Sequence, residues 1–70
     1  MIKIYVYLKS GVVDVYFVES VSKAREHAWQ IWHGGYRMRI KDRIEWFGPH
    51  WIDKICWDMS EEDYLSEKFE

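Results

Sequence analysis

The stretch Ser20–Tyr36, SVSKAREHAWQIWHGGY, decides the fold, because it carries the start signal, the apolar stripe and the stop signal of one helix. Ser20 or Ser22 can cap the first turn by accepting a hydrogen bond from a free backbone N–H. Gly34-Gly35 is expected to end the helix, since glycine accepts the left-handed conformation found after many helix ends. At about 3.6 residues per turn, the apolar stripe consists of Val21, Ala24, Ala28, Ile31 and Trp32.

The residues before this helix predict a β-hairpin. Residues 2–9 and 12–19 both alternate between two kinds of side chain, and Ser10-Gly11 between them suits a two-residue turn. That turn places three pairs on one face: Leu8 with Val13, Val6 with Val15, and Ile4 with Phe17. It places three pairs on the other face: Tyr7 with Asp14, Tyr5 with Tyr16, and Lys3 with Val18. A slip of one residue would turn each side chain of a strand to the other face, so the pattern favours this register.

The residues after the helix continue the sheet. Residues 36–47 predict one strand, or two short strands around Lys41-Asp42, and Gly48-Pro49 predicts a turn. Residues 50–57 predict a last strand, whose more apolar face is expected to meet the helix and contains Trp51, Asp53, Ile55 and Trp57. Residues 60–69 predict a second helix with Ser60 as its N-cap and Asp63 at the capping-box spacing.

These elements predict an α+β fold of the order β-β-α-β-β. We expect a four-stranded antiparallel sheet with the main helix across one face, followed by a short C-terminal helix. Residues 1–57 would form one domain, and residues 58–70 an acidic segment. The first 56 residues hold nine Lys and Arg against six Asp and Glu, whereas the last 14 hold one Lys against six acidic residues.

The composition restricts the class of protein. One cysteine, Cys56, excludes an internal disulfide and fits a reducing cytoplasm. The start of the chain has no signal-peptide pattern, and no apolar run is long enough to span a membrane. Five Trp, five Tyr and three Phe are more aromatic residues than one small core can bury, so we expect an aromatic patch on the surface.

The spacing of titratable residues predicts no enzyme, metal site or cofactor. His27 and His33 lie six residues apart on the helix and would not share a metal. His50 and Cys56 would lie about 20 Å apart on one face of a strand. Cys56 has no base at a spacing that would make it a nucleophile.

Four short segments form a recognisable set: Val18-Glu19-Ser20, residues 23–28, Gly35-Tyr36-Arg37 and Pro49-His50. They resemble segments of small, mostly uncharacterised ββαββ proteins of bacterial genomes, phages and mobile elements. The resemblance implies the fold and no activity. Mobile-element proteins of this size often inhibit host defence enzymes, as anti-CRISPR proteins do. We therefore expect an inhibitor of this class. The Trp-rich last strand and the acidic tail depart from the resemblance.

Two surfaces are candidates for binding another protein, or a second copy of the chain in a homodimer. The first is the sheet face opposite the helix, with Tyr5, Tyr7 and Tyr16, since tyrosine is enriched at interfaces. The second is the acidic segment, with Glu61, Glu62 and Asp63. Two alternatives remain for the tyrosine face. The tail could dock Leu65 and Phe69 on it, within one subunit or in a swapped dimer, or it could stack RNA bases.

A basic alternation offers a different function. Arg37, Arg39, Lys41 and Arg43 would point to one side of an extended strand, at a spacing of about 6.6 Å that resembles the distance between phosphates. A solvated strand edge explains the same pattern. The net charge of −2 counts against nucleic acid. We therefore expect a cytoplasmic protein-interaction domain, with a nucleic-acid-binding module as the alternative.

Overall fold

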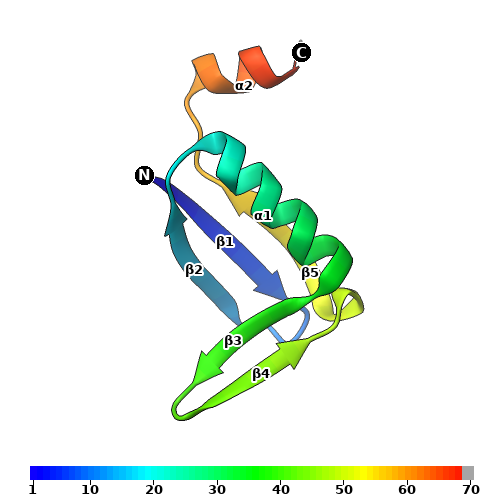
Figure 1. Cartoon of the computed structure of the whole chain (residues 1–70). Coiled ribbons are helices and arrows are strands. Elements are labelled where there is room, and N and C mark those ends of the chain that lie inside the picture. Colours follow the sequence, from blue (N-terminus) through cyan, green and yellow to red (C-terminus); the bar gives the residue numbers. More distant parts are fainter. Residues whose placement is uncertain (69–70) are drawn as a thin grey trace.

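A computed structural model describes residues 1–68, and Figure 1 shows their arrangement. The elements run in the order β1 (Ile2–Leu8), β2 (Val13–Val18), α1 (Val21–Gly34), β3 (Tyr36–Ile40), β4 (Arg43–Phe47), the short 3-10 helix η1 (Pro49–Trp51), β5 (Ile52–Trp57) and α2 (Glu61–Lys68). The α+β class is confirmed, and the order β-β-α-β-β is met with one further strand, because the part after α1 forms three strands. The described residues contain no helix that is long and apolar enough to cross a membrane.

The strands form two sheets, so the prediction of one four-stranded sheet is wrong. One sheet has the order β2-β1-β5, and the other is the β3–β4 hairpin. Residues 36–47 fold as two strands because the chain turns at Lys41, whose φ is 58°. The two halves then pair with each other from Tyr36–Phe47 to Ile40–Arg43. The strands β3 and β4 therefore form their hydrogen bonds with each other and not with the larger sheet. In that sheet, β5 is the strand that pairs with β1.

The predicted register of the first hairpin is wrong by one residue. The observed pairs are Ile4 with Tyr16, Val6 with Asp14 and Tyr7 with Val13. The cause is the loop, which has three residues: the N–H of Leu8 donates to the carbonyl of Val12, and the N–H of Gly11 donates to the carbonyl of Leu8. Gly11 has a φ of 95°, the left-handed conformation that closes such a three-residue loop. Each residue of β2 therefore faces the side opposite to the predicted one.

The core lies between α1 and the three-stranded sheet. Its buried residues are Ile4, Val6, Leu8, Val18, Ala24, Ile31, Tyr36 and Ile52. Ser20 caps α1 by accepting a hydrogen bond from the N–H of Lys23, as predicted. Gly35 follows α1 with a φ of 92°, also as predicted. Trp32 differs from the prediction, since half of its surface is exposed at the margin of the apolar stripe.

The strand β5 meets the helix through a partly different set of side chains from the predicted set. Trp57 pairs with Ile4 and Ile55 pairs with Val6, so both face α1 as predicted. A bulge beside Asp53 then shifts the register, and Ile52 becomes the residue opposite Leu8. Ile52 is buried, whereas Trp51 lies in η1 with half of its surface exposed.

Candidate interaction surface

The sheet face opposite α1 is covered by neither helix. The pairing of β2, β1 and β5 places the following residues on it: Lys3, Tyr5, Tyr7, Val13, Val15, Phe17, Lys54 and Cys56. Three apolar residues of β2 are substantially exposed, Val13 at 45%, Val15 at 41% and Phe17 at 58%. Contiguous exposed apolar side chains of this kind mark contact sites on soluble proteins. We refer to these eight residues as the open face.

The tyrosines of the open face are held in place by polar neighbours. The hydroxyl of Tyr5 donates to the carboxylate of Asp58, with O–O distances of 3.0 and 3.1 Å. This hydrogen bond is the main reason why the pKa of Tyr5 is raised. The ammonium of Lys3 lies 5.4 Å from the ring centre of Tyr5, and that of Lys54 lies 4.6 Å from the ring centre of Tyr7. Fixed aromatic side chains lose less conformational entropy on binding than mobile ones.

The helix α2 leaves the open face uncovered. Figure 1 shows α2 beyond the end of the sheet, and Leu65 keeps 45% of its surface exposed. The alternative in which Leu65 docks on the tyrosines of its own subunit is therefore not seen among the described residues. Phe69, the second residue of that alternative, lies outside the described residues. Ser60 does cap α2, because its hydroxyl accepts from the N–H of Asp63 at 3.1 Å.

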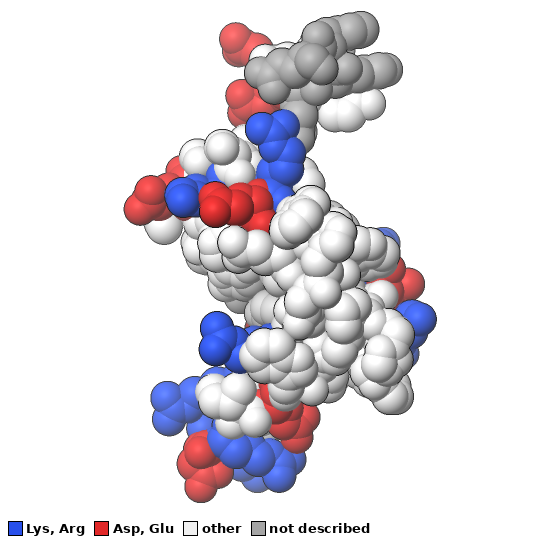
Figure 2. Space-filling model, turned by 45° about the vertical axis from the view of Figure 1, so that its right-hand side comes forward, with Lys and Arg blue, Asp and Glu red and all other residues white. Residues whose placement is uncertain are grey.

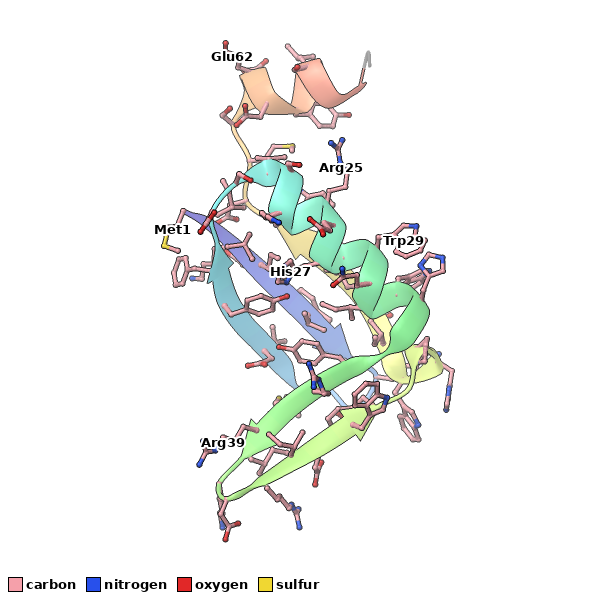
Figure 3. All side chains as sticks on the ribbon, viewed as in Figure 1. Met1, Arg25, His27, Trp29, Arg39 and Glu62 are labelled. Atoms are coloured by element: carbon pink, nitrogen blue, oxygen red, sulfur yellow. The ribbon has the colours of Figure 1, made fainter. Side chains whose placement is uncertain are left out.

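The acidic candidates Glu61, Glu62 and Asp63 form the first turn of α2, and all three are exposed. Figure 3 shows Glu62 at the outer end of the molecule. The acidic turn belongs to α2, whereas Tyr5 and Tyr7 belong to the open face of the sheet. Tyr16 lies on neither, so the predicted contact residues do not form one surface.

Tyr16 lies on the face covered by α1, where the sequence placed it on the opposite face. Its hydroxyl shares a hydrogen bond of 2.9 Å with Nδ1 of His27, a residue that Figure 3 shows on the sheet side of α1. Its ring stacks on Tyr36 with centroids 6.4 Å apart. The hydroxyl of Tyr36 donates to the carboxylate of Asp14. Burial raises the pKa of Tyr36, the Asp14 hydrogen bond raises it further, and burial also raises the pKa of Tyr16.

A hollow of about 310 Å³ opens beside this tyrosine pair. Gln30 and Ile31 of α1 form one wall, and Arg37 and Trp46 of the β3–β4 hairpin form another. The hydroxyls of Tyr16 and Tyr36 are both engaged in the hydrogen bonds to His27 and Asp14. These bonds tie β2 to α1 and to β3, so the cluster acts as a structural link between the two sheets.

A second groove, of about 470 Å³, runs between α1 and β5. Trp29 and Trp32 of α1 line it together with Asp53, Lys54 and Ile55, and the rings of Trp29 and His33 stack with centroids 4.1 Å apart. Figure 2 shows that much of the middle of the molecule is uncharged on the side turned forward there. This groove was not predicted from the sequence, although Trp29 and Trp32, three residues apart on a helix, indicate a shared aromatic surface.

The four basic candidates of residues 37–43 do not share one side. Arg37 and Arg39 pair with Trp46 and Ile44, and the guanidinium of Arg37 lies 5.5 Å from the ring centre of Trp46. Lys41 lies in the turn. Arg43 pairs with Ile40, so it lies on the other face of the hairpin, where it forms a 2.8 Å ion pair with Glu45. The row of four evenly spaced cations predicted from the sequence is absent.

The described residues contain no group of three or more His, Cys, Asp and Glu side chains that could hold a metal ion. Comparisons with family models, with curated proteins and with solved structures found no match for the chain. The resemblance to small ββαββ proteins of mobile elements therefore stays a prediction.

Proposed function

We propose that the protein is an interaction domain that binds another protein through the open face of its three-stranded sheet. The observation that supports this proposal most is the exposure of Val13, Val15 and Phe17 on a face that neither α1 nor α2 covers. Burying apolar surface stabilises a complex by roughly 25 cal/mol per Å² before the entropic cost of association is subtracted.

The arrangement of residues on the open face suits a protein partner. Apolar side chains occupy β2, and Tyr5 and Tyr7 occupy the central strand beside them. Lys3 and Lys54 place positive charge against the two tyrosine rings. An apolar centre with aromatic anchors and a polar rim is the usual composition of a protein–protein interface.

The test compares two pairs of aromatic residues on different surfaces. Tyr5→Ala with Tyr7→Ala removes the anchors of the open face, whereas Trp29→Ala with Trp32→Ala removes exposed aromatic area from α1. Immobilised wild-type protein and the tryptophan variant should retain the same partner from a lysate, and the tyrosine variant should lose it. Loss with the tryptophan variant alone would refute the proposal, as would identical retention by all three proteins. Circular dichroism checks that each variant is folded.

The acidic turn of α2 provides a second contact in this proposal. Glu61, Glu62 and Asp63 concentrate negative charge at one end of the molecule. The variant with Glu61→Gln, Glu62→Gln and Asp63→Asn should bind the same partner with a lower association rate and a weaker dependence on salt. An unchanged association rate would confine the interaction to the sheet.

Nucleic acid is the second candidate, and one observation favours it. Arg37, Arg39 and the exposed Trp46 share one face of the β3–β4 hairpin. This face could contact phosphates with two cations and stack one base. Arg37→Ala with Arg39→Ala should then abolish a mobility shift that wild-type protein gives at low salt. The absence of any shift with the wild type would exclude this function.

A further inference from the structure

We propose that the partner of the β2 edge is a second copy of the chain, which pairs antiparallel with β2 and joins two sheets into one of six strands. This inference goes beyond the proposed function, because it concerns the backbone edge of β2, whereas the partner proposed above binds the side chains of the open face. It requires a free strand edge, a register in which the strand pairs with itself, and charges that agree with that register.

The free edge follows from the hydrogen bonds of the hairpin. The N–H of Leu8 donates to the carbonyl of Val12, so the residues of β2 that point their backbone groups at β1 are Asp14, Tyr16 and Val18. The odd-numbered residues of β1 point the other way, as the bond from the N–H of Asp58 to the carbonyl of Lys3 shows. Val13, Val15 and Phe17 therefore direct their N–H and C=O groups away from the sheet, and β2 is the last strand on that side.

The two edges of the sheet differ in their protection against pairing. The edge strand β5 follows Pro49 and η1, contains the bulge beside Asp53, and carries the charged Asp53 and Lys54. Bulges, prolines and charges are the devices by which edge strands avoid pairing. The strand β2, VDVYFV, has six residues without proline or a bulge, and its one charged residue, Asp14, accepts a hydrogen bond from Tyr36 on the covered face. Figure 1 shows β2 at one edge of the sheet, while α1 lies toward the other edge, beside β5.

One register pairs β2 with itself most completely. If Val15 faces Val15 of the second copy, then Val13 faces Phe17 on both sides, and all three outward-pointing residues form hydrogen-bonded pairs. The apolar side chains of the two strands then form one continuous row on the joined open faces. A shift toward the start of the strand would set Asp14 against Asp14 of the second copy, and like charges directly opposite destabilise a sheet.

The charges at the two ends of β2 agree with antiparallel pairing. Lys9 lies in the loop before β2 and Glu19 directly follows it, and both are exposed. In the register centred on Val15, Glu19 of each copy faces Gly11 of the other, two residues along the loop from Lys9, whose N–H donates to the carbonyl of Trp51. The acidic end of one strand and the basic end of the other then lie at the same end of the joined sheet, whereas parallel pairing would place like ends together. Tyr36 and the β3–β4 hairpin pack on the α1 side at Tyr16, so the open faces stay uncovered.

The first test measures mass in solution. Sedimentation velocity of the wild-type chain should show a dimer that dissociates on dilution. Val15→Pro should give a monomer, because it removes an outward N–H that β1 does not use. Tyr5→Ala with Tyr7→Ala should remain a dimer even though it loses the proposed partner, which separates this inference from the proposed function. A wild-type monomer at millimolar concentration would overturn the inference, and so would a Val15→Pro variant that dimerises like the wild type.

The second test fixes the register and stays informative if Val15→Pro fails to fold. With Cys56→Ser as background, Val15→Cys should give a disulfide-linked dimer on mild oxidation, because Cα atoms of a hydrogen-bonded pair lie about 5.5 Å apart, within disulfide range. Val13→Cys in the same background is the matched control, since the two Val13 residues would lie about 13 Å apart along the strands. Equal cross-linking of both variants, or cross-linking of Val13→Cys alone, would overturn the register. A strand from another protein at this edge would leave both variants unlinked, which also contradicts the inference.

Discussion

The two faces of the three-stranded sheet are built from the same strands and have opposite environments. On the side of α1, Ile4 and Val6 are completely buried. On the open face, Val13, Val15 and Phe17 are equally apolar and keep roughly half of their surfaces in water. Apolar character alone therefore does not decide burial in this fold. Burial depends on which face the single long helix covers, and the 70-residue chain has enough helix for one face.

The largest expected effect contrasts a residue of each face. Ile4→Ala should lower the free energy of unfolding by about 2–5 kcal/mol, because it leaves a cavity in a packed core. Phe17→Ala should change it by less than about 0.5 kcal/mol in the monomer, as surface substitutions usually do. Urea denaturation of dilute protein measures both values. A cost for Phe17→Ala close to that for Ile4→Ala would show that the open face is covered in solution.

A smaller effect tests the junction that keeps the β3–β4 hairpin on the covered side. Gly35 has a φ of 92°, and a Cβ atom there would lie 2.5 Å from the carbonyl oxygen of Phe47. Gly35→Ala should therefore destabilise the fold by about 1–3 kcal/mol.

The neighbouring Gly34 is the matched control for this substitution. A Cβ atom at Gly34 would meet nothing within 4 Å, and Gly34→Ala should stabilise the fold by about 0.4–1 kcal/mol. Thermal unfolding of the two variants gives the comparison. Equal effects would mean that the contact with Phe47 does not restrain the hairpin.

The smallest effect concerns the polar link on the covered face. Tyr36→Phe removes the hydroxyl that donates to Asp14 and should cost about 1 kcal/mol at neutral pH. Because the pKa of Tyr36 is raised in the folded protein, the unfolded chain loses this proton first as the pH rises above 10.0. The stabilisation is therefore complete below pH 10.0 and decreases above it.

Urea denaturation across the alkaline range measures this pH dependence. Tyr36→Phe should reduce the loss of stability at alkaline pH. Part of that loss should remain, because the pKa of Tyr16 is also raised. A variant with the same alkaline loss as the wild type would show that the Tyr36 proton contributes little to stability.

The sequence predicted the elements whose signals are local. The Ser20 cap, Gly35 after α1 and the Ser60 cap each depend on a few neighbouring residues, and all three are confirmed. The three-residue loop at Gly11 was not predicted, because the same residues also suit a two-residue turn at Ser10-Gly11. That single residue moved Tyr16 from the open face to the covered face.

For residues 36–47 the sequence left two alternatives, and the structure confirms the one with two strands around Lys41-Asp42. The remaining errors came from features without a local signal. The bulge beside Asp53 and the pairing of β5 with β1 depend on contacts between distant parts of the chain. The candidate site was therefore predicted in part. Tyr5 and Tyr7 lie on the open face, but its most exposed apolar residues belong to β2 and were assigned to the face that the helix covers.

The central position of β1 also governs the order in which the molecule can assemble. β1 borders β2, its neighbour in sequence, and β5, which begins at Ile52. The first contact closes a short loop, whereas the second must bring together segments about 50 residues apart, which is the slower step in folding. During synthesis, β1 therefore keeps one side unpaired until β5 has been synthesised.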